Sequence, residues 1–240
     1  MITNEVSDFS NLNFQTGEII LINKPYGWSS FKVIYKIREA IGVRKVGHAG
    51  TLDPMATGLL IIATGKKTKE ISSFQDMEKT YCGTITLGKT SPSFDLETDV
   101  AEVKHIEEIS EEKIYSVRDI FLGRILQTPP MYSAIKFNGK SLYKIARKGG
   151  EVERKPREIN VSKFEIKNIS LPDIEFEISC SKGTYIRVIA NDFGEKIGCG
   201  ALLSSLKRTK IGNYSVENAL TVDKFIERIK SANRLGINLI

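Results

Sequence analysis

The sequence is poor in the residues that build disulfide frameworks and metal sites. Its 240 residues include three cysteines, two histidines and one tryptophan. The cysteines, Cys82, Cys180 and Cys199, are odd in number and widely spaced, which argues against a disulfide framework and is typical of a reducing cytoplasm. We therefore expect a cytoplasmic protein. With two histidines and no cysteines at ligand spacing, we expect no metal centre.

The chain also lacks a long apolar run, a flexible linker and an internal repeat. No stretch of 18 apolar residues occurs, so we expect no membrane span. The first ten residues are polar and acidic, without the apolar core of a signal peptide. With 41% hydrophobic residues, the chain is long enough to bury one core. We therefore predict a single domain over residues 1–240.

Positive charge is concentrated in one window of the sequence. The formal net charge is +6, and between residues 136 and 157 eight cations stand against two acids. This window therefore carries a charge equal to that of the whole chain. Such a segment is typical of contact with a polyanion, although a solvated surface has the same pattern. The eight cations are Lys136, Lys140, Lys144, Arg147, Lys148, Arg154, Lys155 and Arg157.

The hydrophobic periodicity predicts an α+β fold. Strands are expected where β-branched and apolar residues run or alternate, at 18–23, 59–63, 80–87, 159–169 and 174–180. Helices are expected at 30–41, 66–75, 110–121, 184–197 and 222–229. Because strands and helices do not follow a strict βαβ order, we predict a mixed or antiparallel sheet flanked by helices.

A loop punctuated by glycine holds a single carboxylate, Asp53. Three glycines and one proline in residues 47–58 exclude a regular helix there. The apolar run 59–63 follows directly and reads as a buried strand. Asp53 is therefore expected on a loop at the edge of a packed sheet, where catalytic groups often lie. An Asx-turn, in which the side chain only caps its own loop, fits the same pattern.

Residues 83–90 match the phosphate-loop pattern G-x-x-x-x-G-K-[ST], which suggests a nucleotide triphosphatase. The four intervening residues alternate like a strand, and Pro92 follows where a helix is required. We therefore interpret this segment as strand and not as a phosphate loop.

Six blocks of the sequence together resemble one enzyme family. They lie in the family's order at 24–30, 47–58, 79–81, 127–134, 181–187 and 206–209. In these blocks the chain is similar to the TruB-type tRNA pseudouridine synthases, which convert the T-loop uridine at tRNA position 55 to pseudouridine. The resemblance implies a pseudouridine synthase fold with a central RNA-binding cleft, a reaction without cofactor, and a monomer acting on the T-arm and T-loop of tRNA.

The resemblance also implies three catalytic residues. Asp53 would attack C1′ of the ribose, or would stabilise positive charge there and take the 2′ proton; the sequence leaves both routes open. Arg187 would pair with Asp53 and keep it ionised. Tyr81 would stack on the uracil and assist proton removal from C5.

Further positions follow from the same resemblance. His48 would help extract the uridine from its stack, Tyr185 and Leu206 would line the base pocket, and Lys24 and Asp95 would lie near it. The basic segment at about 131–157 would hold the RNA backbone.

Many relatives carry a C-terminal RNA-binding domain of the PUA type, and we expect this chain to be a short form without it. An RNA-binding or RNA-folding protein without catalysis is the alternative function.

Overall fold

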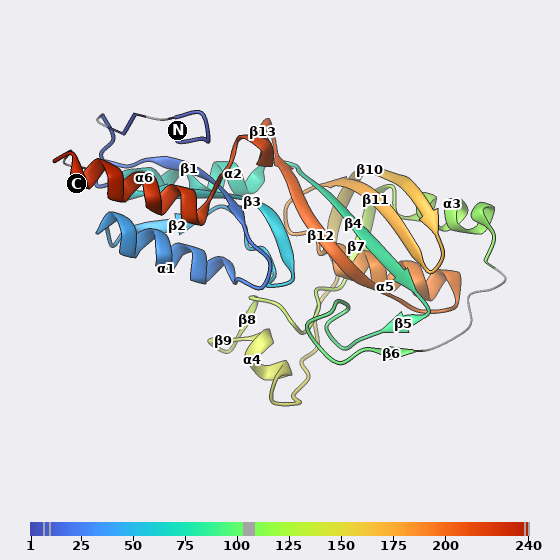
Figure 1. Ribbon diagram of the computed structural model, residues 1–240. Helices are drawn as coiled ribbons and strands as arrows, with labels where there is room; N and C mark the ends of the chain where they lie inside the picture. The colour runs from blue at the N-terminus through green and yellow to red at the C-terminus, as the bar shows by residue number, and fades with distance from the viewer. Residues whose placement is uncertain (7, 10, 103–108, 238, 240) are drawn as a thin grey trace. The chain divides into compact units, whose positions relative to one another are not determined.

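The computed structural model describes residues 1–6, 8–9, 11–102, 109–237 and 239 (Figure 1). The chain divides into two compact units. The first unit comprises Met1–Tyr81 and Leu206–Ile240, and the second comprises Cys82–Ser205. Strands β4 (Lys79–Leu87) and β12 (Ala201–Ile211) each contribute residues to both units.

The first unit is built on a mixed sheet. Strand β1 (Ile19–Lys24) pairs antiparallel with β3 (Ala56–Thr64) and parallel with β14 (Leu220–Thr221). β3 also pairs antiparallel with β2 (Val46–His48) and parallel with β12. β12 in turn pairs antiparallel with β13 (Tyr214–Ser215). Both orientations occur within one sheet, as predicted.

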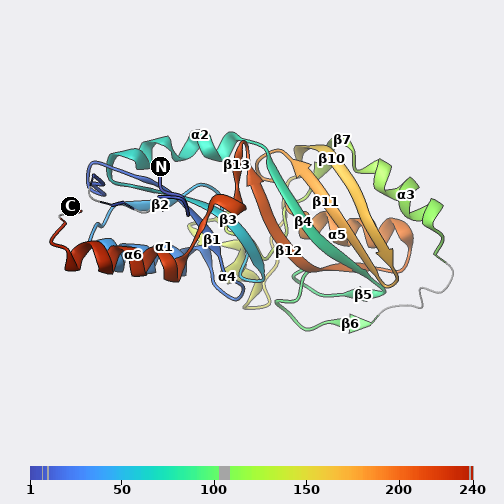
Figure 2. The ribbon, with the colours of Figure 1, turned by 45° about the horizontal axis from the view of Figure 1, so that its top comes forward.

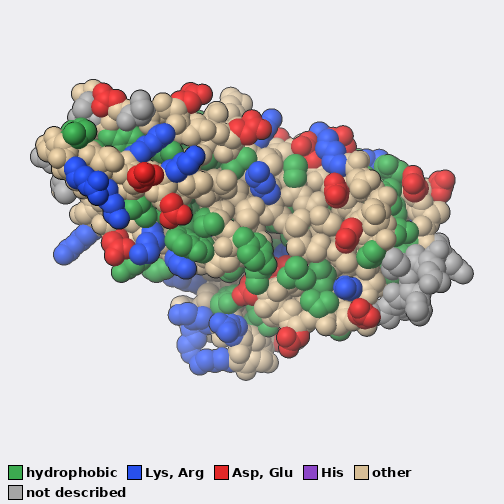
Figure 3. Space-filling model, in the orientation of Figure 1, with side chains coloured by type: hydrophobic (Ala, Val, Ile, Leu, Met, Phe, Trp, Pro, Cys, Tyr) green, Lys and Arg blue, Asp and Glu red, His purple; other side chains and the backbone are tan. Residues whose placement is uncertain are grey.

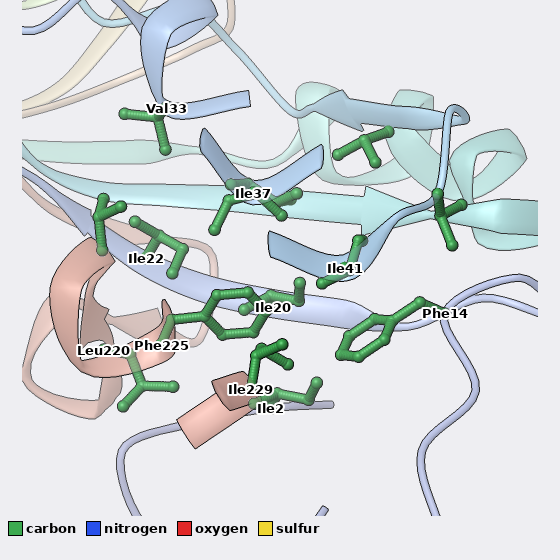
Figure 4. Packing of buried hydrophobic residues seen from close by; sticks show 14 of the residues in the cluster. Ile2, Phe14, Ile20, Ile22, Val33, Ile37, Ile41, Leu220, Phe225 and Ile229 are labelled. Atoms are coloured by element: carbon green, nitrogen blue, oxygen red, sulfur yellow. The ribbon is translucent and has the colours of Figure 1, made fainter. Parts of the chain in front are cut away.

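Helices cover both faces of this sheet because both faces of its strands are apolar. Ile20 and Ile22 of β1 point to one side, where they pack against α1 (Ser30–Ile41) and α6 (Val222–Arg234). Figure 4 shows this packing around Phe225. Leu21 points to the other side, toward α2 (Ile71–Asp76), which follows the 3-10 turn η1 (Gly65–Glu70). Figure 2 shows α2 on the opposite side of the strands from α1 and α6.

Helix α1 begins and ends where the sequence predicts. The Ser29 side chain accepts a hydrogen bond from the Lys32 N–H, which satisfies one free donor of the first turn. Gly42 ends the helix in the left-handed conformation with φ of 69°, which favours glycine. Helix α6 runs five residues beyond its predicted end at residue 229.

The second unit has an antiparallel sheet with helices packed on it. β10 (Arg157–Ser170) pairs with β11 (Asp173–Cys180) and with β7 (Gly123–Gln127), and β4 lies next to β11. Helices α3 (Glu111–Ile120) and α5 (Ile186–Ile197) contact each other. A chain of aromatic contacts forms the core of this unit, made by Phe121, Phe164, Phe176 and Phe193.

Two short hairpins complete the second unit. β5 (Lys89–Thr90) pairs with β6 (Ala101–Glu102). β8 (Lys136–Phe137) and β9 (Lys140–Ser141) form a hairpin whose turn, Asn138-Gly139, has positive φ at both residues. Helix α4 (Leu142–Ala146) follows β9 directly, with Ser141 as its cap, and was not among the predicted helices.

The predicted α+β fold with a mixed, mostly antiparallel sheet flanked by helices is confirmed. Gly83–Leu87 lies within β4, so the phosphate-loop pattern is indeed strand. The predicted helix 66–75 begins with a 3-10 turn, and α5 starts two residues later than expected. The single-domain prediction, the central cleft and the absence of a PUA domain stay predictions. No helix in the described part of the chain has the length and apolarity needed to cross a bilayer.

Candidate active site

Asp53 lies half-buried on a loop of the first unit, between β2 and β3. Its own carbonyl accepts a hydrogen bond from the Ala56 N–H at 3.1 Å, which turns the chain into β3. The Ala49 N–H donates to the Ile61 carbonyl at 2.9 Å and fixes the start of the loop. The loop is therefore tied to the sheet on both sides of the carboxylate.

The residues next to Asp53 are held by the segment that leads into α1. The buried Ser30 hydroxyl donates to the Leu52 carbonyl at 3.0 Å and accepts from the Leu52 N–H at 2.9 Å. On the other side, the Pro54 carbonyl accepts from the Gly27 N–H at 2.9 Å. The Lys24 ammonium lies 3.3 Å from the same carbonyl. Both neighbours of the carboxylate are therefore immobilised, which pre-organises it.

A buried arginine holds the other end of the loop. Arg208, on β12, is 1% exposed. Its Nε donates to the Leu59 carbonyl at 2.8 Å, and its two Nη atoms donate to the Gly50 and Thr51 carbonyls at 3.1 and 3.5 Å. Gly58 lies opposite Arg208 in the strand register, and a Cβ there would approach the Arg208 carbonyl to 2.3 Å. The glycine is thus required for the close approach of β3 and β12.

The charges around the loop set the protonation of two side chains. Burial lowers the pKa of Lys24 from 10.5 to about 8; the Asp53 carboxylate opposes this shift and the Arg208 guanidinium adds to it. Burial also lowers the pKa of His48 below 6.5, and Arg208 acts in the same direction. His48 is therefore mainly neutral at pH 7, whereas Lys24 stays mainly charged and supplies a cation close to Asp53.

Tyr81 and Leu206 lie on β4 and β12, the two strands that contribute residues to both units. Leu206 is half-buried and pairs in register with Ala56, three residues after Asp53. Tyr81 is 8% exposed and follows Thr80, whose carbonyl accepts from the Thr209 hydroxyl of β12 at 3.2 Å. The first unit therefore carries five of the predicted site residues, namely Lys24, His48, Asp53, Tyr81 and Leu206.

The second unit carries a buried cluster around Arg187, in the first turn of α5. Arg187 and Asp95 are 2% and 3% exposed, and their Nη1 and Oδ2 atoms are 3.7 Å apart. Arg187 also donates to the carbonyls of Tyr132, at 2.5 Å, and Ser93, at 3.5 Å. A buried charge needs such partners to offset its desolvation. Asp53 belongs to the other unit, so its predicted pairing with Arg187 stays a prediction.

Tyr185 is clamped between side chains of the second unit. Its backbone N–H and carbonyl are both engaged by the Gln127 amide, at 2.8 and 3.1 Å. The guanidinium groups of Arg157 and Arg187 lie 5.1 and 5.7 Å from its ring centroid. These contacts fix the ring next to two cations.

The basic segment, residues 131–157, is mostly exposed. Lysine and arginine side chains gather over β8, β9 and α4 (Figure 3). Two of the eight cations are half-buried with internal partners: Arg154 donates to the Pro129 carbonyl, and Arg157 donates to the Gly183 carbonyl. The other six are exposed, namely Lys136, Lys140, Lys144, Arg147, Lys148 and Lys155.

Contacts within the second unit anchor this segment. The Tyr143 hydroxyl of α4 donates to the Glu97 carboxylate at 2.6 Å, and this bond raises the pKa of Tyr143. The Tyr143 ring packs edge-on against Tyr132 at 6.0 Å between centroids. Glu97 lies two residues from Asp95, and the Tyr132 carbonyl accepts from Arg187. The RNA-contact prediction for the segment remains untested.

Sequence reasoning missed three supporting residues, Ser30, Gln127 and Arg208. Each acts on backbone atoms of a distant segment, and no local pattern encodes such contacts. All three residues lie within blocks of the family resemblance, at 24–30, 127–134 and 206–209, but the blocks did not indicate these contacts.

Comparison with solved structures shows which known proteins have a similar fold. The chain matches a structure described as a Cbf5-Nop10-Gar1 complex with a TM-score of 0.72 and 27% identity, over 98% of this chain and 63% of that one. It matches an H/ACA RNP bound to a substrate RNA containing 2′-deoxyuridine with a TM-score of 0.70 and 25% identity. That match covers 93% of this chain and 56% of the other. The chain thus spans less than two thirds of these solved proteins.

Sequence comparison gives nearer relatives. A tRNA pseudouridine synthase B of Chloroherpeton thalassium is 48% identical over 229 residues, which cover 93% of this chain and 95% of the relative. One from Flavobacterium johnsoniae is 47% identical over 221 residues, 89% of this chain and 96% of the relative. The N-terminal domain of the TruB family of pseudouridylate synthases matches residues 38–186, which include the Asp53 loop and reach Tyr185. The chain belongs to the TruB family of pseudouridylate synthases.

Proposed function

We propose that this protein converts uridine to pseudouridine at position 55 in the T-loop of tRNA. The observation that carries the proposal is Asp53 on its clamped loop, in a chain of the TruB family. Relatives named tRNA pseudouridine synthase B, at 47–48% identity over almost their whole length, support tRNA as the substrate. An RNA-binding protein without catalysis is not favoured, because the relatives at 47–48% identity are named as synthases.

The reaction is an isomerisation of the substrate nucleotide. The N1–C1′ bond breaks, the uracil rotates, and a C5–C1′ bond forms; C5 then loses its hydrogen as a proton, and N1 takes up a proton from solvent. A carboxylate at the ribose can attack C1′, or can stabilise positive charge there and take the 2′ proton. Asp53 would fill this role, and the neighbouring Lys24 cation favours the ionised form that either route needs.

The other site residues would extract, bind and orient the uridine. Position 55 is stacked within folded tRNA, so the uridine must be flipped before it can react. His48, neutral at pH 7, would assist this extraction. Tyr81 would provide the aromatic surface for the flipped uracil and assist the proton transfer from C5, and Leu206 and Tyr185 would enclose the base.

Arg187 would complete the site by pairing with the Asp53 carboxylate. Its ion pair with Asp95 orients the guanidinium, so Asp95 would act through Arg187. The six exposed cations of the basic segment would hold phosphates of the T-arm and would not read bases. The proposal includes a monomeric enzyme, and a tRNA substrate would place it in the cytoplasm.

Tritium release from [5-³H]uridine-labelled tRNA tests the chemistry directly, because joining at C5 expels that hydrogen. We expect release by wild type and none by Asp53→Asn, with tRNA affinity largely retained. Asp223→Asn, an exposed carboxylate in the first turn of α6, is the matched control and should match wild type. A tRNA transcript with cytidine at position 55 should abolish release, because it lacks the reacting uridine.

Two outcomes would contradict the proposal. Turnover by Asp53→Asn within tenfold of wild type would remove its catalytic role. No release by wild type, with tRNA still bound, would favour the alternative of an RNA-binding protein without catalysis.

A further inference from the structure

Three large aromatic side chains are exposed within ten residues at the start of the first unit. Phe31 is 70% exposed, and Tyr26 and Tyr35 are 56% and 55% exposed. Phe31 and Tyr35 are four residues apart on α1 and therefore lie on one face, one turn from each other. The opposite face of α1 is buried in the core through residues such as Val33 and Ile37. Tyr26, Phe31 and Tyr35, called the aromatic stripe below, are therefore exposed to solvent in the folded unit. Exposed aromatic side chains that lie together suggest a binding partner.

Lysines of α1 lie over two aromatic rings of this stretch, those of Trp28 and Tyr35. The Lys32 ammonium lies 4.2 Å from the centroid of the Trp28 ring, and the Lys36 ammonium lies 5.9 Å from that of Tyr35. From residue 24 to residue 45 the sequence holds six cations and one acid, Glu39. Lys24 is fully buried and Arg38 donates to the Val46 carbonyl, so Lys32, Lys36, Arg44 and Lys45 are the cations that remain toward solvent. Glu39 forms an exposed ion pair with Lys36 at 2.8 Å. In Figure 3, lysine and arginine side chains lie over the region of α1 together with hydrophobic and a few acidic ones. The stretch is therefore basic as well as aromatic.

This combination fits RNA better than a protein surface. Exposed rings offer stacking faces to unpaired bases of any sequence, and neighbouring lysines bind the phosphates between them. A protein partner of such a surface would need a dense acidic patch to match the cations.

The stripe is also tied to the Asp53 loop. The Gly27 N–H, next to Tyr26, donates to the Pro54 carbonyl, and the Ser30 hydroxyl, next to Phe31, bonds both backbone groups of Leu52. A nucleotide held at Tyr26 and Phe31 therefore lies on the segment that supports both neighbours of the catalytic carboxylate.

We propose that Tyr26, Phe31 and Tyr35, with Lys32 and Lys36, form a second RNA-contact surface that binds nucleotides of the substrate tRNA outside the flipped uridine. The inference rests on the proposed function for its substrate. It involves a different stretch of the chain from the basic segment 131–157, and the sequence patterns did not indicate it. Stacking supplies affinity without base reading, and the lysines add a salt-dependent term.

The test is tRNA binding by the full chain carrying Phe31→Ala and Tyr35→Ala together. Stacking on two rings predicts an increase in Kd of at least tenfold. Leu126→Ala is the matched control, because Leu126 is 73% exposed but lies on β7 in the other unit, and its Kd should stay within twofold of wild type. Phe31→Tyr with Tyr35→Phe keeps both rings and should restore wild-type Kd. Lys32→Gln with Lys36→Gln should lower the slope of log Kd against log salt by about one to two.

The outcomes separate this inference from the proposed function. Tritium release by wild type together with an unchanged Kd for the alanine pair would overturn the inference and leave the function in place. An unchanged Kd with a shift in oligomeric state on gel filtration would also overturn it and assign the stripe to contact with a second copy. A raised Kd that the ring-preserving pair restores, with wild-type melting temperatures throughout, supports it even if wild type released no tritium.

Discussion

Replacement of Arg208 tests whether the clamp on the Asp53 loop controls catalysis. Arg208 is buried and donates to three carbonyls, two of which, those of Gly50 and Thr51, lie three and two residues before Asp53. Each buried carbonyl left without its donor costs about 1–3 kcal/mol, so the three bonds of Arg208, one of them long at 3.5 Å, are together worth about 3–5 kcal/mol. We therefore expect Arg208→Met to lower the free energy of unfolding by about that amount. For a chain of this length this corresponds to a fall in Tm of about 6–20 °C.

Arg208→Lys tests the three hydrogen bonds of the Arg208 guanidinium separately from its positive charge. Lysine keeps the cation near Lys24 and His48 but lacks the planar fork that reaches carbonyls on both β3 and the loop. A catalytic group displaced by about 1 Å can lose about 10²-fold in rate. We expect kcat for tritium release to fall by about that factor while the Kd for tRNA stays near the wild-type value.

Thermal melting and single-turnover tritium release measure the two effects. Lys210→Ala is the control, because Lys210 is exposed on the same strand, two residues away. It should match wild type in both assays. A melting temperature within about 2 °C of wild type for Arg208→Met, or a kcat within about threefold of wild type for Arg208→Lys, would refute the role of the Arg208 hydrogen bonds in positioning Asp53.

Three further predictions follow from the geometry. Burial lowers the pKa of Lys24 to about 8, so the unfolded chain binds more protons than the folded one between pH 8 and 10.5. As the pH rises through this range, the free energy of unfolding of the wild type should therefore increase relative to that of Lys24→Met. Guanidinium unfolding of both proteins at pH 7.5 and pH 10 measures this change. An equal difference between the two proteins at both pH values would contradict the burial of Lys24. Replacing Lys136, Lys140 and Lys144, three exposed cations of the basic segment, by glutamine should weaken tRNA binding. It should also lower the slope of log Kd against log salt by about three, whereas an unchanged slope would exclude phosphate contacts by these lysines. Lys89→Ala should leave tritium release within twofold of wild type, since residues 83–87 are strand; loss of activity would revive the phosphate-loop interpretation.

Local patterns in the sequence predicted the regular elements because local interactions determine them. Helix α1 begins at a serine cap and ends at a glycine that adopts positive φ, and both signals are readable without the fold. The strands β1, β4, β10 and β11 follow from their apolar and β-branched residues. Helix α4 escaped prediction because only five residues form it, and tertiary contacts such as the Tyr143–Glu97 bond stabilise it.

The sequence by itself determined the enzyme family, the loop that carries Asp53 and the concentration of charge in residues 136–157. Each of these is a contiguous pattern, so the order of residues suffices to find it. Only the tertiary structure decided that Arg208 is buried against Gly50 and Thr51, that Asp95 pairs with Arg187, and that Phe31 and Tyr35 face water. These facts depend on which distant segments approach one another and on which helix face the core takes up, and such contacts leave no local trace in the sequence.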